Sequence, residues 1–290
     1  MPNRPFIKIG GVPEHFNLPW VMALEQNKFR ELPAEISWNY YPGGTGAMTQ
    51  ALARGELDIA ILLTEGFVSA VQKGLDAAVI HRYISTPLNW GIYSGVHDHL
   101  RYTEQTKIAI SRKGSGSHLM AKIHSQQLPF DLAEHQFIEV HHLDDAIGSL
   151  QEGATDYFYW EHWMTLRFVH EKKIRQIGNF QAPWSGFLVV ASQECINQHP
   201  QLLQDIMAIV KSQCDSFIHD PKTPELISKR FALTSVEAQQ WLNAQEWNFE
   251  DTLEISEMKK AIHAMEEIQA HPSQVNIDHL KASWIHWKKD

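Results

Sequence analysis

The sequence contains little cysteine: Cys195 and Cys214 are its only two. Two thiols are too few for the disulfide framework of a small secreted domain. Cys214 is in register with Ile206, Val210 and Phe217 on one helical face, which favours a small core residue. The sequence leaves open whether the two cysteines form a bridge, because it does not give the distance between their Cα atoms.

Long apolar segments and basic patches are also absent. No run of about 18 consecutive apolar residues occurs, so we expect no membrane span. The formal net charge of −9 favours solubility and disfavours a nucleic-acid surface, which needs a basic stripe. The N-terminal segment MPNRPFIKIGG lacks the apolar region and cleavage site of a secretion signal. We therefore expect a cytoplasmic protein as the chain is written, or a periplasmic one from which a signal has been removed.

The spacing patterns of metal centres and nucleophilic enzymes are missing too. Among 17 histidines, HDH (97–99) and HH (141–142) stand out, yet neither Cys-x-x-Cys nor His-Glu-x-x-His occurs. No Ser-His-Asp or Cys-His arrangement has a recognisable spacing. We therefore predict no metal site and no cofactor, and we assign no catalytic residue. Catalytic groups scattered along the chain would escape this test.

What is present indicates an α/β fold. The 290 residues, 43% of them hydrophobic, are enough for one large domain or two smaller ones. Apolar segments alternate with amphipathic ones through the first two-thirds, which favours largely parallel sheets. The expected strands are residues 6–12, 35–41, 57–63, 77–84, 89–95, 106–111, 137–143 and 186–192.

Several local signals predict helices between and after these strands. We expect a helix from Gly46 to Arg54 with Gly55 after its end, and a helix capped by Ser115 or Ser117. Beyond residue 192 the pattern is mainly helical. Pro200 and Pro224 suit early helical positions, and TSVE (234–237) is a capping box.

Two stretches share a pattern that indicates an internal repeat. LARGELDIA (52–60) and LQEGATDYF (150–158) have the same order of helix, glycine and strand. Three residues recur at a constant offset: Leu52 with Leu150, Gly55 with Gly153, and Asp58 with Asp156. The sequence therefore predicts two similar α/β units.

A glycine-rich turn, YPGGTG (41–46), lies between an expected strand and a helix. It has no following lysine, as a phosphate loop requires, and it does not fit G-x-G-x-x-G, so a nucleotide is disfavoured. Backbone N–H groups at such a helix start, with the Thr45 hydroxyl, suit a small polar or anionic ligand. A tight turn without a ligand is an equally good interpretation of this loop alone. KGSGSH (113–118) is a second turn of this kind.

Four segments together resemble one family. IKIGGVPEHFNLPWVMALEQNKF, YYPGGTGAMTQALARGELDIAIL, KIAISRKGSGSHLMAKI and GATDYFYWEHW follow the order and spacing of type II periplasmic binding proteins over nearly the whole chain. The chain most resembles the nitrate/sulfonate/taurine group of ABC-transporter binding proteins, which includes a thiamine-pyrimidine-precursor branch. The resemblance implies two lobes, each a mainly parallel sheet flanked by helices, with a ligand cleft that closes by hinge motion. Lobe one is expected at residues 1–97 and 186–290, and lobe two at 98–185.

Ligands in such folds sit at the carboxyl ends of strands and at helix starts. The resemblance therefore implies ligand-binding residues in both lobes: His15, Asn17, Thr45, Gly46, Thr64 and Arg82 in lobe one, and Ser115, Gly116, Ser117, His118, Trp160 and Glu161 in lobe two. Two of these carry an alternative. Arg82 either binds an anion or forms a surface or interlobe ion pair. Trp160 either stacks on a ring ligand or belongs to a buried strand, with Phe158 on its own face and Tyr157 and Tyr159 on the other.

The resemblance implies a non-catalytic, monomeric binding protein that captures a small polar or anionic organic molecule for an ABC permease. This chain departs from the family in two features. Exported members carry a signal, which the N-terminal segment here lacks. The pyrimidine-synthase branch carries a cysteine-rich iron motif, whereas this chain has only two cysteines. The alternative is a cytosolic enzyme on the same fold, resembling the menaquinone-pathway dehydratases or the pyrimidine-precursor synthases. A ligand-sensing subunit of a regulatory complex is a third interpretation. Fold alone does not separate the three.

Overall fold

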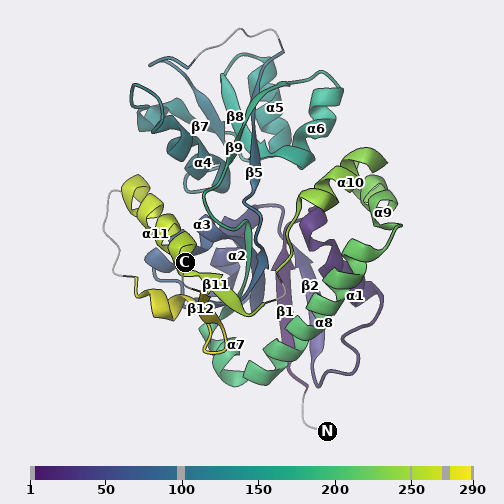
Figure 1. Ribbon diagram of the computed structural model, residues 1–290. Coiled ribbons are helices and arrows are strands. Elements are labelled where there is room, and N and C mark those ends of the chain that lie inside the picture. The colour runs from purple at the N-terminus through teal and green to yellow at the C-terminus, as the bar shows by residue number, and fades with distance from the viewer. Residues whose placement is uncertain (1–3, 97–101, 249, 270–274, 289–290) are drawn as a thin grey trace. The chain divides into compact units, whose positions relative to one another are not determined.

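The structure is a computed structural model, which describes residues 4–96, 102–248, 250–269 and 275–288 (Figure 1). The chain divides into two compact units. Unit 1 comprises Met1–Thr86, Trp184–His263 and Pro272–Asp290, and unit 2 comprises Pro87–Pro183 and Ala264–His271. Each unit is built on one five-stranded sheet.

The sheet of unit 1 has the strand order β2-β1-β3-β10-β4. Its strands are β1 (Phe6–Gly11), β2 (Glu35–Tyr40), β3 (Ile59–Leu63), β4 (Ala77–Ile84) and β10 (Phe187–Ser192). β1 runs parallel to β2 and β3, whereas β10 runs antiparallel to β3 and β4. The apolar strands β3, β4 and β10 are almost entirely buried, as expected for strands covered on both faces.

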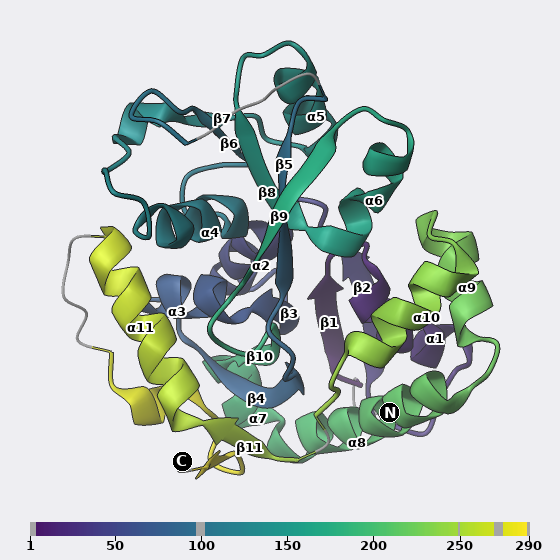
Figure 2. The same ribbon diagram turned by 45° about the horizontal axis from the view of Figure 1, so that its top comes forward.

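Helices from distant parts of the sequence pack in unit 1. They are η1 (His15–Asn17), α1 (Leu18–Glu25), α2 (Gly44–Ala53), α3 (Thr64–Gln72), α7 (Gln193–Gln198), α8 (Pro200–His219), α9 (Thr223–Phe231), α10 (Ser235–Ala244) and η3 (Ile277–Leu280). Two short strands, β11 (Thr252–Glu254) and β12 (His286–Lys288), pair in parallel. In the chain, α11 (Ile255–Gln269) and η3 lie between them. Figure 2 shows α9 and α10 beside α1.

The sheet of unit 2 has the strand order β7-β6-β8-β5-β9. Its strands are β5 (Asn89–Ser94), β6 (Ile108–Ile110), β7 (Phe137–Glu139), β8 (Tyr157–Glu161) and β9 (Arg175–Gln181). The helices are α4 (Gly116–Ser125), η2 (Glu134–Gln136), α5 (Leu143–Gln151) and α6 (His162–His170). β6 pairs in parallel with β7 and β8, and β5 is antiparallel to β8 and β9.

Two strands differ from the sequence expectation. β5 pairs with β8 and β9, so the boundary between the units falls before residues 89–95, which the expected ranges assigned to lobe one. β9 was not expected at all. Its segment, RQIGNFQ, alternates between half-buried and exposed residues and has no apolar run, because it is an edge strand.

The local helix signals agree with the structure. Ser115 is the N-cap of α4, and Thr234 forms the predicted capping box with Glu237. α2 starts at Gly44 rather than Gly46, and Gly55 follows its end with φ of 67°. Cys195 and Cys214 are both free and buried. Within the described residues, no helix is long and apolar enough to cross a membrane.

The internal repeat has a structural basis. The Asp58 carboxylate accepts a hydrogen bond from the Lys8 backbone N–H at 2.7 Å, and the Asp156 carboxylate accepts one from the Lys107 N–H at 2.7 Å. In both units a glycine with φ near +70° precedes this aspartate (67° at Gly55; 69° for the second). Each aspartate therefore fastens the end of a helix–glycine turn to the start of the neighbouring strand.

Candidate functional site

Three serine hydroxyls gather where β6 leads into α4. The Ser115 Oγ accepts from the His118 N–H at 3.3 Å and lies 3.0 Å from the Ser117 Oγ. The Ser117 hydroxyl accepts from the Ser111 N–H at 2.9 Å and donates to the Ser111 hydroxyl at 3.3 Å. Gly116 is the first residue of α4. The serines thus fix a helix start, where free N–H groups and the helix dipole favour negative charge.

His118 adds a donor to this helix start. Its Nδ1 accepts from the Gly114 N–H at 2.9 Å. Burial, together with the charge of Lys122, lowers the pKa of His118 to about 4, so the ring is neutral at pH 7. Because Nδ1 is the acceptor, the proton lies on Nε2. Nε2 is buried and has no hydrogen-bond partner among the described residues. An acceptor supplied by a ligand would satisfy it.

Arg112 is a half-buried cation two residues beyond the end of β6. Burial lowers the pKa of its guanidinium, and the charge of Glu139 at the end of β7 partly offsets this effect. No carboxylate of the described residues lies within ion-pair distance of Arg112. An arginine remains protonated at neutral pH, so this edge of the sheet carries a partly desolvated positive charge.

The side chains of the aromatic strand β8 alternate between the two faces of the sheet, as predicted. Tyr159 contacts α4, with its hydroxyl 2.5 Å from the His124 Nδ1, whereas Trp160 stacks on Phe158 and packs against the hydrophobic core of unit 2. Glu161 is the N-cap of α6, and its Oε2 accepts from the Met164 N–H at 2.8 Å. These contacts give Trp160 and Glu161 structural roles. Their part in ligand binding stays a prediction.

In unit 1 the glycine turn opens α2, with Gly43 as the N-cap. The Thr45 Oγ1 accepts from the Leu63 N–H at 3.1 Å, which ties the start of α2 to the end of β3. The Gly46 carbonyl accepts from the Thr49 hydroxyl at 3.0 Å. Thr45 therefore has one structural bond already, and contact of Thr45 or Gly46 with a ligand stays a prediction.

The segment that leads into β10 is anchored at this same edge. The Thr64 hydroxyl donates to the Ser185 carbonyl at 2.6 Å, and the Trp184 indole N–H donates to Glu65 Oε2 at 2.7 Å. The Ser185 hydroxyl donates to Glu257 Oε2 at 2.5 Å. Thr64 and Glu65, the first two residues of α3, thus hold the backbone of residues 184–186 in place.

His15 and Asn17 follow β1 and are buried. The His15 ring stacks on Trp241 with centroids 4.4 Å apart and contacts Phe231 at 5.6 Å, so α9 and α10 enclose it. Burial lowers the pKa of His15 to about 3. The Asn17 Nδ2 donates to the Val12 carbonyl at 2.9 Å. Both side chains support the chain after β1, and their predicted ligand contacts stay untested.

Arg82 lies within β4, two positions before the strand end, and forms an ion pair with Glu254 of β11 at 3.5 Å. Its side chain is only 10% exposed. The structure thus shows an ion pair, but a largely buried one within unit 1 rather than the surface or interlobe pair that the sequence left as an alternative. A ligand role for Arg82 stays a prediction.

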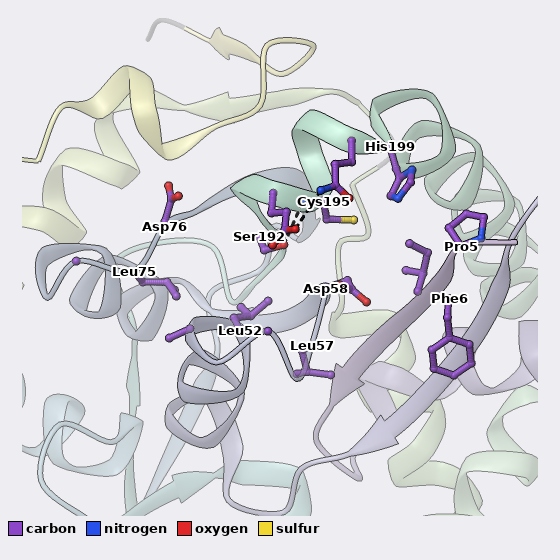
Figure 3. A pocket seen from close by; sticks show the side chains of 16 residues that line it. Pro5, Phe6, Leu52, Leu57, Asp58, Leu75, Asp76, Ser192, Cys195 and His199 are labelled. Carbon is purple, nitrogen blue, oxygen red and sulfur yellow. Dashed lines mark hydrogen bonds between the residues drawn. The ribbon is translucent and has the colours of Figure 1, made fainter. Parts of the chain in front are cut away.

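A pocket of about 590 Å³ lies at the opposite edge of the unit 1 sheet (Figure 3). Asp58, Asp76, Ser192, Cys195 and His199 line it with apolar residues. Its polar groups already have structural roles: Asp58 accepts from a backbone N–H, and Ser192 caps α7. Burial raises the pKa of Cys195 to about 12, so the thiol stays protonated.

His97 and His99 lie outside the described residues, within which no three His, Cys, Asp or Glu side chains converge as a metal site.

Comparison with solved structures identifies the fold. The CA3427 gene product of Candida albicans, described as having the generic periplasmic binding protein fold, matches with a TM-score of 0.83 and 24% identity over 95% of this chain and 93% of its own. The alkanesulfonate-binding protein SsuA of Xanthomonas axonopodis pv. citri, bound to MOPS, matches with a TM-score of 0.75 and 14% identity over 100% of both chains. PhnD1 of Prochlorococcus marinus, in complex with methylphosphonate, gives 0.63 and 13% over 92% of this chain and 99% of its own.

The chain has the type II periplasmic-binding-protein fold. A family described as Ca3427-like PBP matches residues 90–180, which lie within unit 2 of this binding-protein fold. No protein with a curated description matches the sequence.

Three charged residues at the strand ends of the binding-protein fold were missed by the sequence reasoning. Arg112 follows β6, Glu65 follows β3, and Glu14 follows β1, where burial raises the Glu14 pKa to about 7. Their place after expected strands was visible in the sequence. Their burial was not, because it depends on helices distant in the chain.

Proposed function

We propose that this chain is a solute-binding protein that captures a small organic anion by hinge closure and delivers it to an ABC-type permease. The anionic group is a sulfonate, a phosphonate or a group of similar charge. One observation carries the proposal: Arg112, a half-buried cation with no carboxylate partner among the residues that the structure describes, shares the edge of unit 2 with the start of α4.

The donors of unit 2 match such an anion chemically. A tetrahedral oxyanion has several acceptor oxygens and fixed negative charge. Arg112 supplies guanidinium N–H groups, α4 supplies backbone N–H groups, and His118 supplies a neutral Nε2–H. A neutral imidazole donor suits a ligand that is already ionised, because no proton has to move on binding.

The structural neighbours support the same ligand class. SsuA is described as an alkanesulfonate-binding protein, and PhnD1 was solved with methylphosphonate. We carry this ligand chemistry to the present chain as part of the proposal, together with the role in import.

Isothermal titration with propane-1-sulfonate and methylphosphonate tests the anion site. Arg112→Gln removes a charge-assisted hydrogen bond worth about 1.5–3 kcal/mol, so we expect the affinity to fall by roughly 10- to 100-fold. Lys113→Gln is the matched control, because it removes the same charge from the exposed neighbouring residue and should change affinity less than about threefold. Equal losses in both variants, or none in Arg112→Gln, would contradict the assignment.

Two further measurements test whether the ligand is bound without being converted and whether binding closes the hinge. The ligand recovered after incubation should give an unchanged NMR spectrum, and its consumption would favour the enzyme alternative. Small-angle scattering should show a smaller radius of gyration when ligand is added. An unchanged radius at saturation would argue against hinge closure.

A further inference from the structure

The pocket of about 590 Å³ in unit 1 lies where the strands of its sheet begin, away from the strand ends considered above. Phe6 is the first residue of β1, and Asp58 and Asp76 directly precede β3 and β4. All of its lining residues belong to unit 1. The volume is that of a small-molecule site, and the anion site proposed above uses none of these residues.

The lining of this pocket is negatively charged. Three carboxylates line it: those of Asp58, Asp76 and Glu194. None of the lining residues that the structure describes is lysine or arginine. The turns that end α2 and α3 also line it, through Gly55 and Gly74, and helix C-termini carry partial negative charge. The Lys8 ammonium donates to the Gly55 carbonyl at 2.6 Å, so one of these helix ends already accepts from a cation.

The three carboxylates keep acceptor oxygens available. Asp58 Oδ2 accepts from the Lys8 backbone N–H at 2.7 Å. Glu194 Oε1 accepts from the Gln198 side-chain amide at 3.0 Å. The second oxygen of each, and both oxygens of Asp76, have no hydrogen-bond partner among the described residues. A positively charged donor forms the strongest hydrogen bonds with such oxygens.

A buried thiol lines the same pocket. Cys195 is 4% exposed, and Figure 3 shows its sulfur on the side of the pocket that His199 and Pro5 enclose. Its Sγ has no hydrogen-bond partner among the described residues. Burial raises the pKa of this thiol, and the charges of Asp58 and Glu194 raise it further. Both carboxylates therefore act at the end of the pocket that holds the sulfur, which is itself a weak acceptor.

The acidic groups are spread along the pocket. Among the described residues, no three His, Cys, Asp or Glu side chains converge as a metal site, so a single metal ion does not match them. In Figure 3, Asp76 lies at one end of the pocket and Asp58 and Cys195 at the other, with the apolar side chain of Leu52 between them. An occupant that satisfies both ends is elongated, positively charged at each end and apolar in the middle.

We propose that this pocket is a second ligand site, which binds a linear aliphatic diamine in its doubly protonated form. One ammonium group donates to Asp76. The other donates to Asp58 and Glu194, beside the Cys195 sulfur. The methylene chain lies along Leu52. The site lies within unit 1, so it stands whether or not the anion is bound by unit 2.

Isothermal titration at low salt tests the site with diamines from 1,3-diaminopropane to 1,6-diaminohexane, each compared with the n-alkylamine of equal chain length. Two equivalent orientations favour a symmetric diamine twofold, and an exposed ion pair adds a modest factor. We therefore expect the best diamine to bind about three- to tenfold more tightly than its monoamine. In Asp76→Asn this preference should fall to about twofold, with the affinity for the monoamine unchanged.

Two further variants separate the ends of the pocket from the overall charge. Glu194→Gln should weaken diamine and monoamine alike, by about two- to fivefold, because both place an ammonium group at the sulfur end. Asp215→Asn is the matched control: its carboxylate is 66% exposed on α8 and does not line the pocket, so the wild-type preference should remain.

Thiol labelling locates the occupant. Methyl methanethiosulfonate reacts with thiols and not with amines, and peptide mapping by mass spectrometry distinguishes the two cysteines. The best diamine should slow the modification of Cys195 severalfold. Cys214, which is buried beside Tyr83 and does not line this pocket, is the internal control and should react at an unchanged rate.

The outcomes separate this site from the anion proposal. No diamine binding, a preference unchanged in Asp76→Asn, or an unprotected Cys195 overturns the diamine site. A loss in Asp215→Asn equal to that in Asp76→Asn also overturns it, because general attraction to the net charge of −9 then explains the binding. The affinity for propane-1-sulfonate should be the same in Asp76→Asn and the wild type. Diamine binding without sulfonate binding supports the diamine site and contradicts the anion proposal.

Discussion

The close approach of α2 and α3 in unit 1 allows a quantitative test of the packing beside the glycine turn. A Cβ atom added at Gly66 would lie 2.3 Å from the Thr45 Cγ2 and 3.2 Å from its Cβ. Thr45 itself is fixed, because its Oγ1 accepts from the Leu63 N–H. Gly66→Ala therefore forces a methyl group into occupied space.

Two opposing terms set the size of the effect. Overpacking of this kind costs about 1–3 kcal/mol. Alanine in place of glycine inside a helix gains about 1 kcal/mol, and Gly66 lies within α3. We expect a net loss of roughly 0–2 kcal/mol from the single change. In a Thr45→Ser background the Cγ2 is absent and the hydroxyl remains, so Gly66→Ala should become neutral or stabilising by up to about 1 kcal/mol.

The assay is a double-mutant cycle by denaturant unfolding of the wild type, Gly66→Ala, Thr45→Ser and the double variant. The expected coupling energy is about 1–3 kcal/mol, with the double variant more stable than the sum of the single changes predicts. Additive effects within about 0.5 kcal/mol would refute the contact, because independent sites add within that margin.

Three other predictions concern titration and the internal repeat. Glu65 has a raised pKa, so the folded state holds a proton that the unfolded state loses between pH 4.5 and about 7. Stability should fall over that range, and Glu65→Gln should remove about 3 kcal/mol of this dependence in pH-dependent melts. His15 has a lowered pKa, so the unfolded state binds the proton first. The free energy of unfolding should therefore decrease as the pH drops from 6.5 towards 3, on the order of 5 kcal/mol in total. In acid denaturation, His15→Phe should lose less stability over this pH range than the wild type. Asp58→Asn and Asp156→Asn should each cost about 1–2 kcal/mol in chemical denaturation, because each loses one charged acceptor of a backbone N–H. A clearly larger effect in one unit would contradict equivalent roles.

The sequence predicted the local features of this fold, such as helix caps and turns. Ser115 as a helix cap and Gly55 after α2 depend on neighbouring residues only, so their patterns were readable. The repeated aspartates were readable too, since Asp58 and Asp156 hold the same position in two similar segments. The edge strand β9 gave no signal, because three of its seven residues are exposed and the others are only half-buried.

The sequence predicted where along the strands and helices the candidate residues lie, and much less of their environment. That strand ends and helix starts bind a ligand stays a prediction. The environment of each side chain depended on distant segments: Trp241 stacks on His15, and Glu254 pairs with Arg82. Periodicity carries no information about such contacts. For the same reason the burial of Arg112 and Glu65 became visible only in the folded chain.

The most direct test of the central claim is a thermal-shift screen of the purified protein, followed by recovery of the ligand. The panel contains alkanesulfonates, aminoalkanesulfonates, methylphosphonate, nitrate and neutral pyrimidines. A ligand at 100 times its dissociation constant stabilises the fold by about 2.7 kcal/mol, which raises the melting temperature by several degrees. The account predicts such a shift with at least one organic anion, recovered unchanged. A shift with neutral compounds alone, or none with any organic anion, would contradict it.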